Sequence, residues 1–563
     1  MTQVEWDHLC DVLVVGSGAG GLTSAIVAAD GHADVLVIEK GRRYGGTSAT
    51  SGGMIWVPCN HLAAALGHED NADDAFTYMR GLIDEDVPDA LIRSYIQHSP
   101  EMLKYVLDNT HVEFQALPYP DYQAEREGGR IGWRTLEPLP YDGKNLGKSF
   151  DTLEPPLPAN ILFGRYGWTV FEAATLMMRP KGWLRTLVKV IVRYHADIRQ
   201  RLKSRHSRFL TSGGSLVGRL RRSLDDRKIP LWTYTRLIRL EQDADGRVVG
   251  VVAEKDGRAI RIGARKGVIL ATGGFERNGE LRARFGNGSA RPEASSSQIN
   301  NTGDGVVAAM DRNIEVARMD SAWRVPAIRV PGQERATPIF FERSLPGSMM
   351  VDVAGRRFVN ESADYHLLSQ AMMATNGAQN GDQPVYALFD GRFHERYPMG
   401  PVLPMMPQWL MGAAARSVLV SAPTIRDLAL KLKMDPAVLE GSVARFNGFA
   451  QSGKDEDFGR GDHAYDKLIA DPRAGVNSNL APLDQPPYFA VPIHLGDIGT
   501  NGGVVTDPVG RALSQDGKVV DGLYACGNVT ASVMGRSYPG GGATLGPAMT
   551  FAFLAARHAT GKN

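Results

Sequence analysis

Two short runs of consecutive apolar residues near the start of the chain predict buried parallel strands. They cover residues 11–15 (Asp-Val-Leu-Val-Val) and 34–38 (Asp-Val-Leu-Val-Ile), and a helical pattern lies between them over residues 22–29. A similar run at 267–271 follows a strand-rich stretch, 231–262, with two Asp-Gly turns, which predicts a small antiparallel meander. The N-terminal part of the chain is therefore predicted to form an α/β domain.

The end of the chain repeats this pattern. Residues 522–525 predict another buried strand, and residues 546–556 predict a helix. A Rossmann-like domain built from both ends of the chain, with a second domain inserted between them, accounts for this order. We predict a cofactor-binding domain from residues 1–295 and 486–563, and an α+β substrate domain over residues 296–485.

Glycines at the first strand-to-helix turn predict a dinucleotide site. Gly16 makes the turn tight, Gly18 admits a pyrophosphate, and Gly21 lets the helix pack on the strand. Glu39 ends the second strand, where a carboxylate can accept both ribose hydroxyls. NAD and FAD share this fingerprint, but a second loop rich in glycine and hydroxyl groups, residues 45–53, suits a longer cofactor.

Bulk composition excludes several classes of protein. The chain of 563 residues has a net charge of +1, which gives no argument for a nucleic-acid partner. Its three cysteines are widely spaced without a Cys-x-x-Cys pair, so we expect neither a disulfide framework nor a metal site. The N-terminus has no secretory pattern, and no apolar run is long enough to span a membrane. These features predict a cytoplasmic protein.

A tyrosine followed by a proline and three glycines lies near the C-terminus, at residues 538–542. Proline fixes φ and glycine allows close backbone approach, so this loop can present the Tyr538 hydroxyl and the Gly542 N–H to one ligand oxygen. Two such donors would polarise a carbonyl group.

The sequence resembles the 3-ketosteroid Δ1-dehydrogenases, FAD enzymes of the fumarate-reductase-like group. The similarity spans most of the chain outside residues 155–210, and its motifs are at residues 16–21, 45–53, 119–122, 355–365, 455–462, 496–503 and 538–542. The resemblance implies that Tyr365 removes a proton from C2 while the flavin N5 accepts a hydride from C1. It implies that Tyr538 and the Gly542 N–H hold the C3 oxygen, and that Tyr122 hydrogen-bonds Tyr365, although Tyr119 one turn away could take that role.

A tyrosine with a pKa near 10 is a weak base at neutral pH, and lowering it by about 3 units requires about 4 kcal/mol. We expect Tyr122 to supply part of this. Non-covalent FAD is implied, and the fingerprint and the resemblance together predict cofactor contacts at Gly16, Gly18, Ala19, Gly20, Gly21, Glu39, Lys40, Gly46, Thr47, Ser48, Ser51, Gly52, Gly53, Ala271, Gly273, Gly274, Gly527, Asn528, Gly542 and Leu545.

Three other functions are compatible with parts of this pattern. A 3-oxo-5α-steroid 4-dehydrogenase would share the fold and the carbonyl clamp but place its base elsewhere. A fumarate-reductase-like enzyme would need His and Arg residues around the flavin, whereas the C-terminal loop offers Met534, Arg536 and Tyr538 with no histidine. A non-catalytic flavin-bearing membrane or scaffold protein would have no reason to keep both Tyr365 and Tyr538.

Residues 155–210 form a basic insertion. Residues 179–208 hold ten Lys or Arg against one acid, Asp197. On a helix, Leu184, Leu187, Val188 and Ile191 share one face, and Arg185, Lys189 and Arg193 lie on another. This pattern predicts peripheral contact of residues 161–208 with an anionic membrane, the alternative being a charged helix packed on the protein or on another subunit. If the insertion meets a membrane, a quinone would be a suitable electron acceptor.

Overall fold

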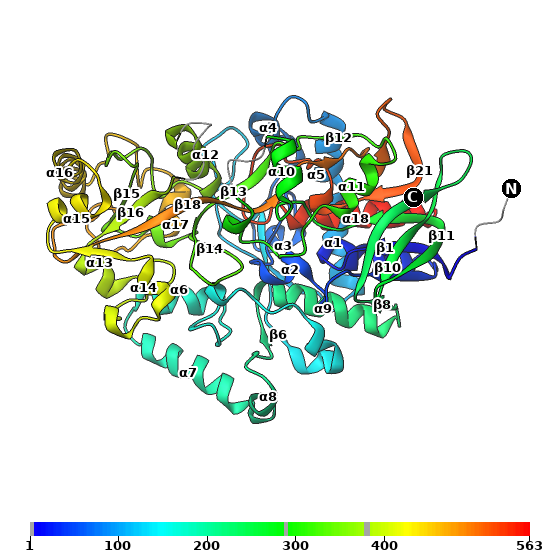
Figure 1. The fold of residues 1–563 in the computed structure, drawn as a ribbon, viewed down its shortest axis with the longest axis horizontal. Coiled ribbons are helices and arrows are strands. Elements are labelled where there is room, and N and C mark those ends of the chain that lie inside the picture. Colours follow the sequence, from blue (N-terminus) through cyan, green and yellow to red (C-terminus); the bar gives the residue numbers. More distant parts are fainter. Residues whose placement is uncertain (1–4, 287–290, 377–382, 563) are drawn as a thin grey trace.

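The two ends of the chain meet in one mixed sheet of eight strands (Figure 1). The computed structural model describes residues 5–286, 291–376 and 383–562. Five neighbouring strands run parallel, in the order β8 (Leu231–Trp232), β2 (Val35–Ile38), β1 (His8–Val15), β11 (Arg258–Leu270) and β21 (Val519–Ala525). Val12 pairs with both Val35 and Gly267. The four apolar runs identified in the sequence are therefore strands of one sheet.

A meander and an edge strand extend this sheet. β9 (Thr235–Gln242) pairs with β10 (Val248–Lys255), which pairs with β11, both in antiparallel register. The turns at 245–246 and 256–257 connect these strands, which confirms the predicted meander. At the other side, β20 (Arg511–Leu513) is antiparallel to β21.

Helices from both ends of the chain pack together on the sheet. α1 (Ala19–Asp30) follows β1, and α18 (Leu545–Ala559) closes the fold beside it. Gly20 allows this close packing, because a Cβ there would lie 3.0 Å from the Ala548 carbonyl oxygen. α5 (Asp89–Asn109) and α9 (Ser212–Asp226) join the same hydrophobic core.

A second, antiparallel sheet of six strands forms the other body of the protein (Figure 1). Its order is β14 (Thr337–Pro338), β13 (Ala322–Ile328), β18 (Tyr488–Thr500), β16 (Val385–Phe389) and β15 (Ser348–Val351), with β17 (Val420–Ala422) also paired to β18. α12 (Tyr365–Asn376), α15 (Ile425–Leu432) and α16 (Pro436–Ser452) contribute to its two cores. The fold is thus a Rossmann-like FAD-binding unit with an α+β unit beside it, as predicted.

The limits of the two domains stay a prediction, and two features bear on them. β18 falls within the segment 486–563 assigned to the FAD-binding domain, yet it is the central strand of the second sheet. Conversely, Val306 and Ile314, assigned to the substrate domain, pack in the core of the first sheet. The chain therefore crosses between the two bodies more often than a three-part division suggests.

The basic insertion forms three helices at the outer edge of the molecule (Figure 1). They are α6 (Val170–Met178), α7 (Trp183–Ala196) and α8 (Ile198–Lys203). Among the residues that the structure describes, no helix combines the length and apolar composition needed to cross a bilayer.

Candidate active site

The first strand-to-helix turn has no room for side chains. Gly16 has a φ of +111°, and a Cβ there would lie 2.2 Å from the Ala271 carbonyl oxygen. A Cβ on Gly21 would lie 2.1 Å from the Gly16 carbonyl oxygen. A Cβ on Gly18 would meet only the Ser48 hydroxyl, at 3.2 Å. The backbone at Gly18 is therefore the approachable part of the turn, as a pyrophosphate site requires.

Glu39 stands at the end of β2 beside this turn. Its carboxylate accepts hydrogen bonds from the Ser17 hydroxyl at 2.5 Å and from the Gly41 N–H at 2.8 Å. These bonds and a third from the Ser17 N–H at 3.2 Å fix its orientation and leave about one acceptor position for a further donor, because a carboxylate offers about four. Lys40, the next predicted cofactor residue, turns elsewhere and pairs with Asp304 at 2.9 Å.

The loop at 45–53 folds against α1. It contains the short helix α2 (Gly46–Thr50), and the Ser48 hydroxyl accepts the Ala19 N–H at 3.0 Å. The Ser51 hydroxyl accepts the Gly53 N–H at 3.0 Å. No described atom lies within 4 Å of a Cβ placed on Gly46 or on Gly52. These two positions border open space beside the glycine turn.

The other predicted cofactor residues lie at the ends of β11 and β21. Gly273 has a φ of +75° next to Asn301, and a Cβ on Gly274 would lie 2.2 Å from the Thr500 hydroxyl. Gly527 has a φ of +76°. Leu545 is the first residue of α18 and is buried. The strand ends of a parallel sheet meet at one edge, where ligands of such folds bind.

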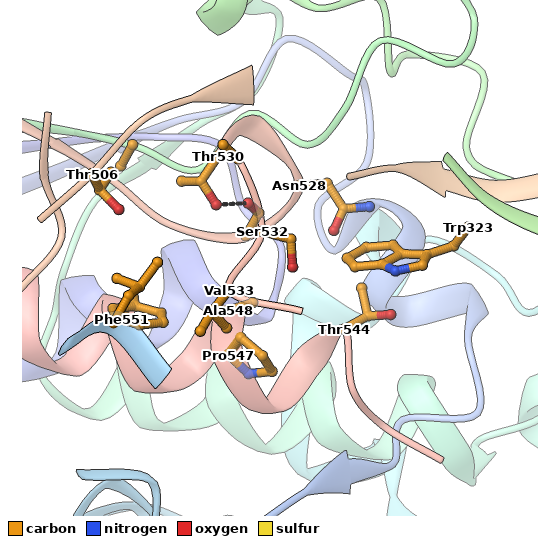
Figure 2. A pocket seen from close by; sticks show the side chains of 14 residues that line it. Trp323, Thr506, Asn528, Thr530, Ser532, Val533, Thr544, Pro547, Ala548 and Phe551 are labelled. Atoms are coloured by element: carbon orange, nitrogen blue, oxygen red, sulfur yellow. Dashed lines mark hydrogen bonds between the residues drawn. The ribbon is translucent and has the colours of Figure 1, made fainter. Parts of the chain in front are cut away.

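A narrow pocket connects this edge with the C-terminal loop. Gly527, Asn528, Thr544 and Trp323 line it, and Figure 2 shows the side chains of Asn528, Trp323 and Thr544 next to one another. The Thr544 hydroxyl lies 2.9 Å from the Tyr538 hydroxyl. Predicted cofactor residues and the predicted ketone clamp therefore adjoin the same pocket.

The tyrosine-glycine loop is held through its carbonyl groups. The Pro539 carbonyl accepts the Tyr78 hydroxyl at 2.7 Å and the Tyr122 N–H at 2.9 Å. The Gly541 carbonyl accepts the Thr135 hydroxyl at 3.0 Å, and the Gly542 carbonyl accepts the Trp56 N–H at 3.2 Å.

Gly542 has a φ of +100°, and a Cβ would lie 2.4 Å from the Ile55 carbonyl carbon. Its N–H donates to no acceptor in the described part of the chain. The loop that carries Tyr538 therefore has one backbone N–H available to a ligand acceptor, as the predicted pair of donors requires.

The structure brings the three predicted catalytic tyrosines together. The ring centroids of Tyr365 and Tyr538 are 5.3 Å apart, those of Tyr122 and Tyr365 are 5.5 Å apart, and those of Tyr122 and Tyr538 are 5.5 Å apart. Tyr365 is the first residue of α12, Tyr122 precedes β5 (Thr135–Pro138), and Tyr538 precedes α18. Three distant segments thus supply one cluster.

Burial makes the Tyr365 hydroxyl harder to ionise. It raises the pKa of Tyr365 well above its ordinary value, and the negative charge of an ionised Tyr538 would raise it further. Hydrogen bonding with Tyr122 lowers that pKa. The direction of the Tyr122 effect agrees with the prediction, whereas desolvation of the phenolate, the largest influence, acts in the opposite direction.

Sequence reasoning missed several residues of the cluster. The ring centroid of Tyr465 lies 4.8 Å from that of Tyr122. The ring centroid of Phe340 lies 5.2 Å from that of Tyr365, and the ring centroid of Trp323 lies 5.8 Å from that of Tyr538. Arg343 is buried, and its Nε and Nη2 have no partner in the described structure. No motif marks these positions, and only the resemblance of the segment 455–462 pointed toward this region.

Comparisons with known proteins place this chain in a family. The family model described as FAD binding domain matches residues 11–545. A 3-oxosteroid 1-dehydrogenase of Mycobacterium tuberculosis is 38% identical over 97% of this chain and 98% of its own length. A 4-oxocyclohexanecarboxylate 2-dehydrogenase of Sinomonas cyclohexanicum is 33% identical over 98% of this chain and 93% of its own.

Among solved structures, the chain is similar to a 3-ketosteroid Δ1-dehydrogenase from Sterolibacterium denitrificans in complex with 1,4-androstadiene-3,17-dione. The two are 38% identical with a TM-score of 0.94, over 99% of this chain and 100% of the other. Fold, glycine turn and family match define an oxidoreductase that uses FAD. The chain belongs to the 3-oxosteroid 1-dehydrogenase family.

The residues present fit FAD. The glycine turn excludes side chains, Gly46 and Gly52 face open space, and the Glu39 carboxylate keeps about one acceptor position. The individual cofactor contacts and the non-covalent attachment stay predictions.

Proposed function

We propose that this enzyme introduces a double bond between C1 and C2 of a 3-oxo-4-ene steroid, with Tyr365 as the base at C2. The observation that carries the proposal is the convergence of Tyr365 with Tyr538 beside the available Gly542 N–H. The relatives named for 3-oxosteroid 1-dehydrogenation support the substrate class.

In this proposal, Tyr538 and the Gly542 N–H bind the C3 carbonyl oxygen. Negative charge grows on that oxygen as the C2 proton leaves, and two fixed donors stabilise it. Tyr365 takes the C2 proton as its phenolate and becomes a neutral phenol, and Tyr122 stabilises the phenolate before the transfer by donating a hydrogen bond. FAD, when bound, accepts the hydride from C1. The steroid loses one proton and one hydride in total, and an external acceptor then receives the two electrons.

Aromatic walls favour a steroid. Phe340 and Trp323 flank Tyr365 and Tyr538, and both present apolar rings. A second candidate is a monocyclic ketone with a carboxylate, as in the name of the Sinomonas relative. The buried Arg343 favours it, because two of its nitrogens lack partners in the described structure, and its charge offsets part of the rise in pKa that burial causes at Tyr119 and Tyr465.

The test is to mix purified holoenzyme with androst-4-ene-3,17-dione and an artificial electron acceptor. We expect the 1,4-diene as the product. Reaction only with 5α-saturated 3-ketosteroids would indicate 4-dehydrogenation, and reaction only with 4-oxocyclohexanecarboxylate would indicate the monocyclic ketone.

We also propose that α7 and α8 lie on an anionic membrane surface. Leu184, Val188 and Val192 form an exposed row along α7, and Leu202 of α8 is 84% exposed. Arg185 and Lys181 are exposed beside this row. Such a surface would let a poorly soluble steroid enter from the bilayer, and a quinone would then be a suitable electron acceptor.

A further inference from the structure

The Thr47 hydroxyl accepts two hydrogen bonds from a distant segment. The Gln298 N–H donates to Thr47 Oγ1 at 3.1 Å, and the Asn301 side-chain amide donates to the same atom at 3.0 Å. A hydroxyl oxygen has two lone pairs and one proton. With both lone pairs engaged, the Thr47 hydroxyl can act only as a donor to a further partner.

No described residue accepts that proton. Thr47 is partly exposed within the loop where Gly46 and Gly52 face open space, in the region predicted to bind the cofactor. FAD carries phosphate oxygens, ring carbonyl oxygens and ring nitrogens that accept hydrogen bonds. A fixed donor at this place can bind one of these acceptors.

Asn301 is in turn oriented by a buried carboxylate. Its amide nitrogen donates to Glu276 Oε1 at 2.6 Å as well as to Thr47, so both amide hydrogens are used. Glu276 is completely buried, and its other oxygen accepts the Thr500 N–H at 3.3 Å. The Thr500 hydroxyl also accepts the Phe275 N–H at 3.0 Å, which ties the carboxylate to β18.

Burying a carboxylate costs free energy unless hydrogen bonds compensate for the lost solvation. Here it selects one orientation of the Asn301 amide: the nitrogen, and not the oxygen, faces Thr47. We propose that Glu276 is a positioning residue for FAD, which acts through Asn301 to hold the Thr47 hydroxyl as a hydrogen-bond donor to the cofactor. Glu276 makes no contact with FAD in this arrangement.

The test measures FAD affinity by reconstituting apoprotein and following flavin fluorescence, so it does not depend on turnover. Thr47→Val should weaken FAD binding about tenfold, the loss expected for one hydrogen bond, whereas Thr47→Ser should stay within about threefold of the parent. Glu276→Gln should weaken FAD binding several-fold. Asn301 and the Thr500 N–H donate to two different oxygens of Glu276, and glutamine has only one side-chain oxygen. Glu254→Gln, an exposed change of the same charge on β10, is the control.

The double variant separates positioning from general destabilisation. If Glu276 acts through Thr47, then Thr47→Val combined with Glu276→Gln should bind FAD no more weakly than about Thr47→Val alone. Losses that multiply in the double variant, or full affinity in Thr47→Val, would overturn the proposal. If Glu276→Gln fails to fold, Asn301→Ala takes its place in the same cycle, with the same expected result and the same contradicting one.

Discussion

The backbone N–H of Tyr122 donates to the Pro539 carbonyl oxygen at 2.9 Å. The residue proposed to assist the base and the loop proposed to hold the ketone are therefore joined by one hydrogen bond. A shift of either segment would change the distance between the base and the oxygen clamp, and positioning of this kind contributes strongly to catalysis. The residues proposed for the base and for the oxygen clamp thus belong to one connected unit, although Tyr122 and Pro539 lie 417 positions apart in the sequence.

Replacing the proposed base should abolish turnover while the steroid still binds. Tyr365→Phe keeps the ring and its packing against Phe340, but it removes the hydroxyl, so we expect the turnover number to fall by a factor of about 10² to 10⁴. Binding of a 3-ketosteroid, followed by perturbation of the flavin absorbance, should change little. Tyr386→Phe, on β16 in the second sheet, is the matched control. Normal turnover in Tyr365→Phe would remove this residue from the mechanism.

The rate of flavin reduction should rise with pH. Burial raises the pKa of Tyr365 above its ordinary value, so the phenolate is a minor species at neutral pH and grows about tenfold per pH unit. Tyr122→Phe removes a hydrogen bond that lowers this pKa, so its profile should shift to higher pH and its rate at pH 7 should fall. Stopped-flow reduction between pH 6 and 10 measures both; a rate that declines across this range would contradict the assignment.

A side chain at Gly542 should destabilise the fold and the clamp together. Gly542→Ala places a Cβ 2.4 Å from the Ile55 carbonyl carbon at a φ of +100°, so we expect a loss of at least about 2 kcal/mol in the free energy of unfolding and a large loss of turnover. Gly448→Ala in α16 is the control, because nothing lies within 4 Å of its Cβ. Thermal denaturation of the two variants compares them directly, and equal stability would show that the loop adapts.

The sequence was sufficient for the parts of the site that depend on local chemistry. The turn at Gly16 to Gly21 needs glycine for reasons that neighbouring residues dictate, and Tyr365 and Tyr538 lie in recognisable motifs. Tyr465 and Thr135 could not be predicted, because each reaches the site only through the tertiary fold and carries no motif. The effect of burial on the pKa of Tyr365 could not be predicted for the same reason, because the burial comes from segments distant in the chain.

A buried acid next to the base should make stability depend on pH. Asp364 is buried, and burial raises its pKa to about 6, although its Oδ1 accepts the His366 N–H at 2.9 Å. Its folded-state pKa lies above the unfolded value, so its contribution is most favourable below about pH 4 and is lost as the pH rises through about 6. Asp364→Asn keeps the acceptor and removes the charge.

The variant should therefore gain stability over the parent as the pH rises, on the order of 3 kcal/mol above pH 7. Denaturant unfolding of both proteins at pH 5, 6, 7 and 8 measures the difference. Asp521→Asn, which is exposed, should show no such trend. A gain that is the same at every pH would mean that titration of Asp364 is not its cause.

Membrane binding should depend on the exposed apolar row of α7 more than on its charges. Arg193, which the sequence placed on the charged face, instead pairs with Glu172 at 2.9 Å and stacks on Phe209 at 3.6 Å, so it is occupied within the protein. Leu184, Val188 and Val192 are each 57% exposed. Changing these three residues to serine should strongly reduce co-sedimentation with liposomes that contain anionic lipid, whereas Val476→Ser, at a site 92% exposed elsewhere, should not.

Salt distinguishes the two contributions to that binding. The Lys and Arg side chains beside the row attract anionic lipid over about 10 Å at 0.1 M salt, so high salt should weaken binding of the parent. The apolar contact is insensitive to salt, so a residual fraction should remain bound in the parent and disappear in the triple serine variant. If the triple serine variant sediments with liposomes as the parent does at every salt concentration, then α7 does not face the lipid. That outcome would favour contact of the exposed row with another subunit.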